Sequence, residues 1–485
     1  MTIPGWAGRR AWPALLGLAI LLVAGAAAAT PIALVDSRAA GFVGQAESGP
    51  LDQAVLVESY AQVVATFGAS PAGLANPYLA PSVAAYFANG GQRLHVVRVA
   101  GADDASLIGA DGGPGARTGL QALRDMDEVA AVAIPGAVSP AVQAALIAHC
   151  EAAGHRMAIL DPVSATDPNA VMTQRSGLAT TNGFGALYFP WVVAAPAGVS
   201  QQLPPSGFVA GIFARTSPPV SPAGTTNGVV ATASGVSYAV GTTLQGTLNP
   251  LGINAIRFFS GSGVLAFGAR TLASNLDWQY VPVRRSGSAI ETSIEQGTRW
   301  ALAEPNDETL WSQLRADIGD FLHSLWVAGW FQGVSAGEGY FVKCDATTMT
   351  AQDLAEGRTV VLVGFAPLSP AEFLLLRIVL DRSAVAGVPP GTPSLALDAP
   401  RPNPAHAGTT LSFELPRAEA VTMRVHDVAG RVVRTLADGV VFGAGRHDLR
   451  WDGRDDAGGE AAAGVYLVRL ATGERVLTRR VSLVR

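Results

Sequence analysis

Residues 129–160 read VAAVAIPGAVSPAVQAALIAHCEAAGHRMAIL, and they describe a strand, a helix and a second strand. Val129–Ile134 is an apolar run of strand length, and Arg156–Leu160 is another. Ser139 is a good N-cap and Pro140 suits the first helical position. The apolar residues of this helix share one face at helical spacing: Val142, Leu146, Ile147 and Cys150. This order predicts a parallel α/β sheet with helices on its faces.

Strand-rich sequence precedes this unit, and a further strand follows it. We expect strands at 39–44, 55–57 and 94–99, and another at 187–193. Ser59 is the expected N-cap of a helix that runs toward Phe67. A short helix over 83–88 is expected to end at Asn89, Gly90 and Gly91, which tolerate a left-handed backbone.

From Gly252 to Asp381 the pattern is that of an α+β domain. Ile290 and Ile294 are interpreted as the beginning of one helix. A long amphipathic helix is predicted from six apolar residues at helical spacing: Leu310, Leu314, Ile318, Phe321, Leu322 and Leu325. Three strands are expected at 340–344, 360–365 and 373–380.

The C-terminal part is all-β. Residues 384–393 read AVAGVPPGTP and are typical of a linker. From Ser394 to Arg485 six strands are expected, at 410–415, 421–427, 431–436, 445–451, 464–470 and 475–483. Short alternating strands at this density predict a sandwich.

Bulk properties exclude a nucleic-acid binder. The 485 residues contain 38 Asp and Glu against 33 Lys and Arg, a net charge of −5, whereas nucleic-acid binding requires a basic surface. The two cysteines, Cys150 and Cys344, are expected to be buried unpaired thiols in different domains, with a single disulfide as the alternative. Lys343 is the only lysine, which we attribute to codon composition; bidentate ion pairs at subunit contacts are the alternative.

The N-terminus resembles a secretory signal peptide. Arg9 and Arg10 precede an apolar stretch, Ala11–Val23, and a run of small residues ends at Ala29. We therefore expect residues 1–29 to be a signal peptide and the protein to be exported. A retained signal anchor is the alternative, although the stretch is short for a membrane span.

Several polar clusters are candidates for catalytic or metal sites. His149, His155, Asp161 and Ser206 are the candidates for a serine protease triad, but nothing in the sequence brings them together. The spacing of His149, Cys150 and His155 matches no zinc motif. We therefore predict no catalytic residue, no metal site and no cofactor.

Three other segments are interpreted as structural. The regular spacing of calcium ligands is absent at Asp452, Asp455 and Asp456, so these residues are interpreted as part of a hairpin turn. The glycines of 111–119 form no phosphate loop, because no Lys followed by Ser or Thr comes after them. The aromatic run 325–331 is interpreted as core packing, with a partner-contact surface as the alternative.

A few polar groups interrupt apolar segments: Glu304, Asn306, Arg284 and Arg285. They indicate salt bridges or subunit contacts. Whether the partners lie within one subunit or between subunits stays open at this stage.

Residues 39–378 resemble phage tail sheath proteins, the subunits of contractile tails and injection machines. The segments that carry the resemblance keep the family order: GFVGQAESGPL (41–51), VAAYFANGGQRLHVVRV (83–99), PPSGFVAGIFART (204–216), GINAI (252–256), GARTL (268–272), WQYVPVRR (278–285), GTRWALAEPN (297–306), Leu310-Trp311, FVKCD (341–345) and PAEFLLLRI (370–378). The resemblance implies a subtilisin-like α/β domain, an α+β sheath domain and polymerisation around an inner tube protein. Members with this fold lack the protease triad.

Residues 395–485 resemble the Ig-like sorting modules of exported bacterial proteins, similar to that of the flagellar hook-capping protein. The carriers are PRPNP (400–404), VHDVAGRVV (425–433), GRHDLRWDG (445–453) and AGVYLVRL (463–470). In type IX secretion such modules direct passage across the outer membrane, which implies transient contact with export machinery.

The expected organisation is therefore α/β plus α+β, followed by an all-β Ig-like sandwich. Its expected parts, in chain order, are a signal peptide (1–29), a β-rich sheath region (30–118), a subtilisin-like domain (119–260), an α+β sheath domain (261–383), a linker (384–393) and an Ig-like domain (394–485). Thr30–Val35 is only a stub of the family's N-terminal arm, which puts the usual exchange of strands between subunits in doubt.

The expected function is structural and non-catalytic. The leading hypothesis is an exported sheath-like protein that binds copies of itself, without nucleic acid or small-molecule substrate. The alternatives are a monomeric exported binding protein on a sheath-like body, a cytoplasmic sheath subunit of a phage-tail-like particle that starts near Thr30, and a hydrolase.

Overall fold

The computed structural model describes residues 31–484 except 70–72, 179, 197, 369–373, 382–395, 399, 407, 416, 428–430, 474 and 475. The predicted signal peptide and the predicted linker lie outside the described residues. The chain divides into two compact units, residues 1–382 and 383–485, called here the body and the module. None of the helices in the described part combines the length and the apolar character that a bilayer crossing requires.

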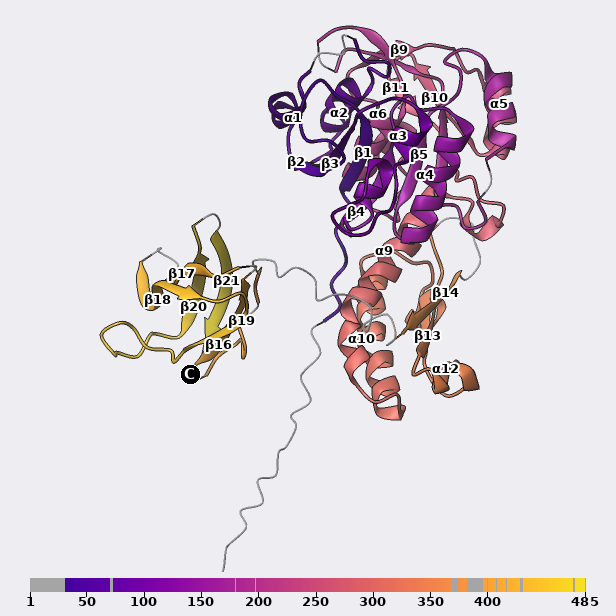
Figure 1. The fold of residues 1–485 in the computed structure, drawn as a ribbon. Helices are drawn as coiled ribbons and strands as arrows, with labels where there is room; N and C mark the ends of the chain where they lie inside the picture. Colours follow the sequence, from indigo (N-terminus) through magenta and orange to yellow (C-terminus); the bar gives the residue numbers. More distant parts are fainter. Residues whose placement is uncertain are drawn as a thin grey trace, which may run out of the picture. The chain divides into compact units, whose positions relative to one another are not determined.

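An eight-stranded sheet forms the centre of the body (Figure 1). Its strands, in spatial order, are β11 (Gly263–Ala266), β10 (Ile253–Phe259), β6 (Gly185–Phe189), β5 (Met157–Leu160), β4 (Val129–Ala133), β1 (Ala39–Gln45), β3 (Arg93–Val99) and β2 (Ala54–Val57). The six inner strands are mutually parallel, and the edge strands β11 and β2 are antiparallel to their neighbours. The predicted parallel sheet is confirmed.

Strand β1 lies in the middle of this sheet, between β3 and β4. The expected boundary at residue 118 therefore does not separate two sheets. The reason is that β1 is buried on both faces and pairs on both edges, so the strands before and after residue 118 complete each other.

Helices cover both faces of the sheet. One face carries α1 (Tyr60–Phe67), α2 (Leu79–Ala88) and α6 (Ser206–Arg215), and the other carries α3 (Asp104–Ile108), α4 (Pro140–Ala153), α5 (Pro168–Ser176) and α8 (Thr242–Leu248). Adjacent strand residues such as Phe42 and Val43 enter opposite cores, as the period of two requires. The predicted caps Ser59 and Ser139 each accept a bond from a backbone N–H in the first turn.

Two sequence predictions about element boundaries were wrong. The strand expected at 187–193 is two strands, because the chain leaves the main sheet at Pro190 and continues as β7 (Val192–Ala194), in a small sheet with β8 (Gln201–Leu203) and β9 (Ala233–Val236). Ile290 and Ile294 lie in the second half of α9 (Val281–Gly297), which begins with Pro282 in its first turn. Residues 281–288 are buried although several of them are polar, so the spacing of apolar residues did not indicate where this helix starts.

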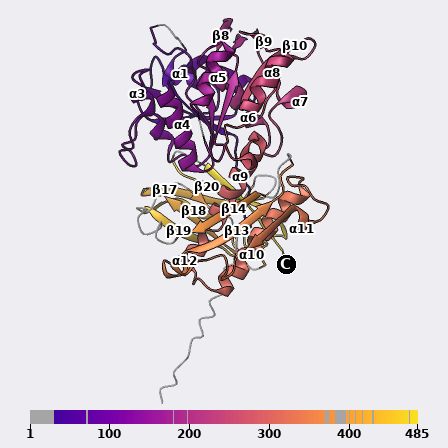
Figure 2. The same cartoon turned by 90° about the vertical axis from the view of Figure 1, so that its right-hand side faces the viewer.

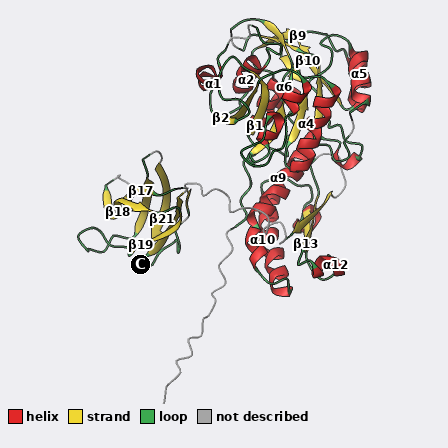
Figure 3. Ribbon diagram, in the orientation of Figure 1, coloured by secondary structure: helices red, strands yellow, loops and turns green. Residues whose placement is uncertain are grey.

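The α+β part of the body packs two long helices on one small sheet. Helices α9 and α10 (Glu308–Val327) share an apolar core with the antiparallel strands β12 (Tyr340–Lys343), β13 (Thr359–Phe365) and β14 (Leu374–Leu380). Figure 3 shows these helices beside the strands, and Figure 2 shows the same region turned by 90°. Short helices α11 (Ala336–Gly339) and α12 (Ala351–Ala355) flank the strands, and α7 (Gly224–Asn227) precedes β9. All six predicted apolar residues of α10 are buried.

The module consists of two antiparallel sheets around one core. One sheet contains β15 (Ala396–Leu397), β16 (Thr409–Leu415) and β19 (Gly445–Trp451), and the other contains β18 (Val432–Phe442), β17 (Glu419–Asp427), β20 (Gly464–Ala471) and β21 (Val476–Leu483). The core includes Phe413, Trp451 and Val468. The predicted all-β sandwich is confirmed, and only β18 is much longer than expected.

Candidate functional site

Asp161 and Ser206, two of the residues considered for a triad, lie together at the carboxyl end of the sheet. Asp161 follows β5, and Ser206 is the first residue of α6. The Asp161 carboxylate accepts bonds from the Ser206 hydroxyl at 2.8 Å, the Ser206 N–H at 2.8 Å and the Gly136 N–H at 2.9 Å. The pair therefore ties the turn after β4 to the start of α6.

The environment of Asp161 is electrostatically unusual. Burial raises the pKa of its carboxyl to about 6, and its three hydrogen bonds limit the increase. The Ser206 side chain is completely buried, and Asp161 is only 2% exposed. A substrate from solution has no access to either group in this arrangement.

No imidazole completes a triad. His149 and His155 instead contact Arg156, whose Nη1 lies 2.8 Å from His149 Nε2 and whose Nε lies 3.2 Å from His155 Nε2. Burial and the Arg156 charge lower the pKa of His149 to about 3, and the same causes lower that of His155. Both rings are therefore neutral acceptors in a structural network, and the structure does not bring them to Ser206.

Arg156 is the centre of this network, and sequence reasoning missed it. Its side chain is completely buried and also donates to the carbonyl groups of Arg124 and Met126. The signal in the sequence was the arginine that opens an otherwise apolar strand directly after a histidine. A charged side chain there requires several acceptors.

No metal-binding group of three His, Cys, Asp or Glu side chains occurs within the described ranges. Cys150 and Cys344 are both free and buried, as expected. Burial raises the pKa of each thiol to about 12, so neither is a reactive thiolate at neutral pH.

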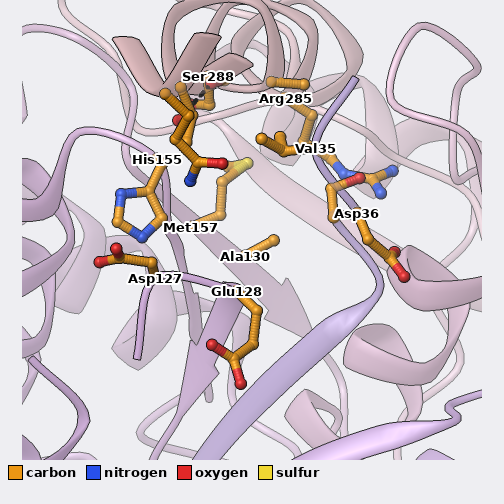
Figure 4. A pocket seen from close by; sticks show the side chains of 13 residues that line it. Val35, Asp36, Asp127, Glu128, Ala130, His155, Met157, Arg285 and Ser288 are labelled. Carbon is orange, nitrogen blue, oxygen red and sulfur yellow. Dashed lines mark hydrogen bonds between the residues drawn. The ribbon is translucent and has the colours of Figure 1, made fainter. Parts of the chain in front are cut away.

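A cavity of about 290 Å³ lies at the opposite, amino-terminal end of β4 and β5 (Figure 4). Its three acidic lining residues are paired within the chain. Glu128 Oε1 lies 2.9 Å from His95 Nε2, Asp36 forms a bidentate pair with Arg38, and Asp127 lies 3.9 Å from Arg299. In open parallel sheets ligands bind at the carboxyl ends of the strands, so the location of this cavity does not indicate an active site.

Three of the four polar groups that interrupt apolar segments, Arg284, Arg285 and Asn306, have partners within the chain. Arg285 donates two bonds to the carbonyl groups of Phe213 and Thr216, and Arg284 lies 3.5 Å from Glu291. Asn306 bonds to three groups, one each from Trp311, Arg358 and Thr359. These three residues make contacts inside one subunit, whereas Glu304 is exposed.

The remaining candidates are structural too. In the aromatic run 325–331, Leu325, Trp330 and Phe331 are buried, although Val327 is exposed, so core packing is confirmed. Asp455 closes a turn by accepting from the Gly459 N–H, and Asp456 accepts from the Thr435 N–H. Residues 111–119 form a loop in which Asp111 pairs with Arg117.

Comparison with known proteins agrees with this geometry. Residues 273–381 match the phage tail sheath C-terminal domain, and residues 403–475 match the FlgD Ig-like domain. The helical sheath of the anti-feeding prophage in its contracted state is 26% identical, with a TM-score of 0.59, and the match covers 79% of this chain and 100% of that one. The chain is a tail-sheath-like protein.

Two further relatives support the assignment of the tail-sheath-like body. The contracted PVC sheath of an extracellular contractile injection system is 26% identical, with a TM-score of 0.58, over 79% of this chain and 100% of that chain. The tail sheath protein of Vibrio phage KVP40 is 24% identical over 185 residues, which are 37% of this chain and 27% of that protein. The matched stretch therefore spans about a quarter of the phage protein.

Proposed function

We propose that this tail-sheath-like protein is an exported, non-catalytic subunit that associates with copies of itself. The observation that carries the proposal is the match of its body to a complete contracted-sheath chain, from end to end. Two solved relatives are a helical sheath and a sheath complex. A body with a similar fold is suited to the same kind of assembly, and an inner tube protein is the corresponding second partner.

The absence of catalysis is part of the proposal. The Asp161–Ser206 pair has the position of a nucleophile at a helix start, which supports a subtilisin-like arrangement of the α/β part. The pair is buried, however, and the histidines are engaged by Arg156. We expect Ser206 to stay unmodified by a fluorophosphonate probe, and Ser206→Ala to change no hydrolytic activity of the preparation. Labelling at Ser206 would contradict this part of the proposal.

Export is supported by the agreement of the two ends of the chain. The N-terminal sequence has the signal peptide pattern, and the module matches the FlgD Ig-like domain. We assign the module a role in sorting and residues 1–29 a role in export, which places the protein in the periplasm, on the cell surface or outside the cell. Mass spectrometry of the protein from its native host tests this: a mature N-terminus at Thr30 in the exported fraction is expected, and intact Met1–Ala29 on cytoplasmic protein contradicts it.

Electron microscopy of the purified full chain tests self-association. Over a concentration series we expect helical tubes or defined rings. Discrete single particles at every concentration would favour the alternative, a monomeric exported binding protein. Tubes that form only from unprocessed cytoplasmic protein would favour a cytoplasmic sheath subunit.

A further inference from the structure

The outer face of the module contains a cluster of three arginines on neighbouring strands. Arg424 of β17 lies directly opposite Arg469 of β20, and Arg480 of β21 lies opposite Leu467, two residues from Arg469. Their side chains face away from the core, because the residues between them, such as Met423, Val468 and Val481, are the buried ones. We call these three residues the arginine face.

The outward positions of β17, β20 and β21, all of them described, include no Asp or Glu. One carboxylate reaches the cluster from β18, where Asp438 lies 2.9 Å from Arg424, and no ion pair with Arg469 or Arg480 occurs among the described residues. Like charges directly opposite on a sheet destabilise it, so the arrangement is more favourable when an anionic surface covers it.

The body contains a matching pair of acids on helix α10. Asp317 and Asp320 are one helical turn apart, and neither forms an ion pair within the described part of the chain, where the arginine of this helix, Arg315, pairs with Glu308. Asp317 Oδ2 is buried without a hydrogen-bond partner. The mutual proximity of the two carboxylates contributes to a raised pKa of Asp317, after burial.

The two clusters have compatible charge and spacing. Residues 261–381 contain 14 Asp and Glu against 8 Lys and Arg, whereas residues 394–485 contain 13 Arg against 11 Asp and Glu. Arg469 and Arg480 are diagonal neighbours about 7–8 Å apart, and helical residues at i and i+3 are about 5–6 Å apart, a difference that long arginine side chains can span. Two guanidinium groups of the sheet can therefore meet two carboxylates of the helix at once.

We propose that the arginine face of one copy binds Asp317 and Asp320 on α10 of a second copy. This inference rests on the proposed self-association and gives the module a role in it. The contact is intermolecular, and Arg469, Arg480 and Asp320 are exposed, so it weakens as salt screens the interaction beyond about 8 Å at physiological ionic strength.

Charge reversal on the full chain tests the contact by sedimentation velocity over a concentration series. A cation variant carries Arg469→Glu and Arg480→Glu, and an acid variant carries Asp317→Arg and Asp320→Arg. Each variant alone is expected to need a roughly tenfold higher concentration for association than the wild type. Matched controls are Arg450→Glu on β19 and Asp277→Arg before α9, both exposed and both outside the proposed contact, which should leave association unchanged.

The decisive measurement mixes the two variants in equal amounts. Each then offers the other an oppositely charged partner surface, so association should return to the wild-type concentration range, and circular dichroism should show both variants folded. Association of the variants at the wild-type concentration, or no recovery on mixing, overturns this contact but leaves self-association intact. A wild type that stays monomeric overturns both. A third outcome also overturns the proposed contact: the wild type binds anionic phosphatidylglycerol vesicles, the cation variant does not, and association is unchanged. This result would assign the arginine face to a membrane.

Discussion

Ser206 donates its hydroxyl to Asp161 across a separation of 45 residues, and the 2.8 Å bond lies inside the protein with no imidazole beside it. A serine at a helix start and an aspartate at a strand end have the positions of hydrolase residues. Here the carboxylate instead satisfies the N–H groups of Gly136 and Ser206. The interaction therefore stabilises the sheet and α6, and it gives the body a titratable group in its core.

The first prediction concerns the pH dependence that this group produces. Burial raises the pKa of Asp161 from 3.8 to about 6, so the folded protein binds the proton more tightly than the unfolded chain does. The contribution of this proton to stability is complete below about pH 4 and is lost as the pH rises through about 6. A shift of this size corresponds to about 3 kcal/mol.

Urea unfolding of the body transition between pH 4 and pH 8 measures this contribution. Asp161→Asn should remove most of the loss of stability over pH 4–6, whereas Asp277→Asn, an exposed control, should retain the wild-type profile. Parallel profiles for the wild type and Asp161→Asn would contradict the assignment of the raised pKa to Asp161.

The second prediction concerns Arg156, which donates to two imidazoles and two carbonyl groups from a completely buried position. Arg156→Met leaves these acceptors without a donor, so the free energy of unfolding should fall by about 3 kcal/mol or more. The exposed control Arg299→Met should change it little.

A second readout separates this network from simple loss of packing. Because burial and the Arg156 charge together lower the pKa of His149 to about 3, the methionine variant should raise that pKa, as followed by NMR of the imidazole protons. An unchanged His149 titration would mean that the charge of Arg156 does not act on this ring.

The third prediction concerns the contact between helices α2 and α6. A Cβ atom on Gly211 would lie 2.5 Å from the Tyr86 carbonyl oxygen and 2.7 Å from Asn89 Cβ, so Gly211→Ala should destabilise the body by about 1–3 kcal/mol. Gly246→Ala in α8 is the matched control, since its Cβ would meet no atom within 4 Å, and it should stabilise by about 0.4–1 kcal/mol. Thermal unfolding of both variants measures the two opposite signs, and equal signs would refute the argument.

The fourth prediction concerns the independence of the module. Trp451 is completely buried, packs on Tyr466 and donates its indole N–H to the Arg454 carbonyl at 2.9 Å. Trp451→Ala should cost the module about 3–5 kcal/mol. Because the body and the module are separate compact units, calorimetry should show that only one of two transitions moves. A shift of both transitions would show that the units unfold together.

Local patterns in the sequence were sufficient where the physical cause is local. The start of the helix Pro140–Ala153 was predicted with its cap, because Ser139 acts within one turn of it. The apolar spacing in α10 likewise fixed which side chains are buried. The strand expected at 187–193 failed for the opposite reason: the apolar run continues, but the pairing partners of the backbone change at Pro190.

The sequence by itself determined the elements, the alternation that requires a parallel sheet, the all-β module and the resemblance to sheath proteins, because these depend on residue periods and ordered segments. Only the tertiary structure decided that β1 occupies the middle of the sheet, that Arg156 takes both histidines, and that Asp161 meets Ser206 without them. Contacts between residues tens of positions apart depend on how strands pair and how buried polar groups find partners, and no local pattern specifies either.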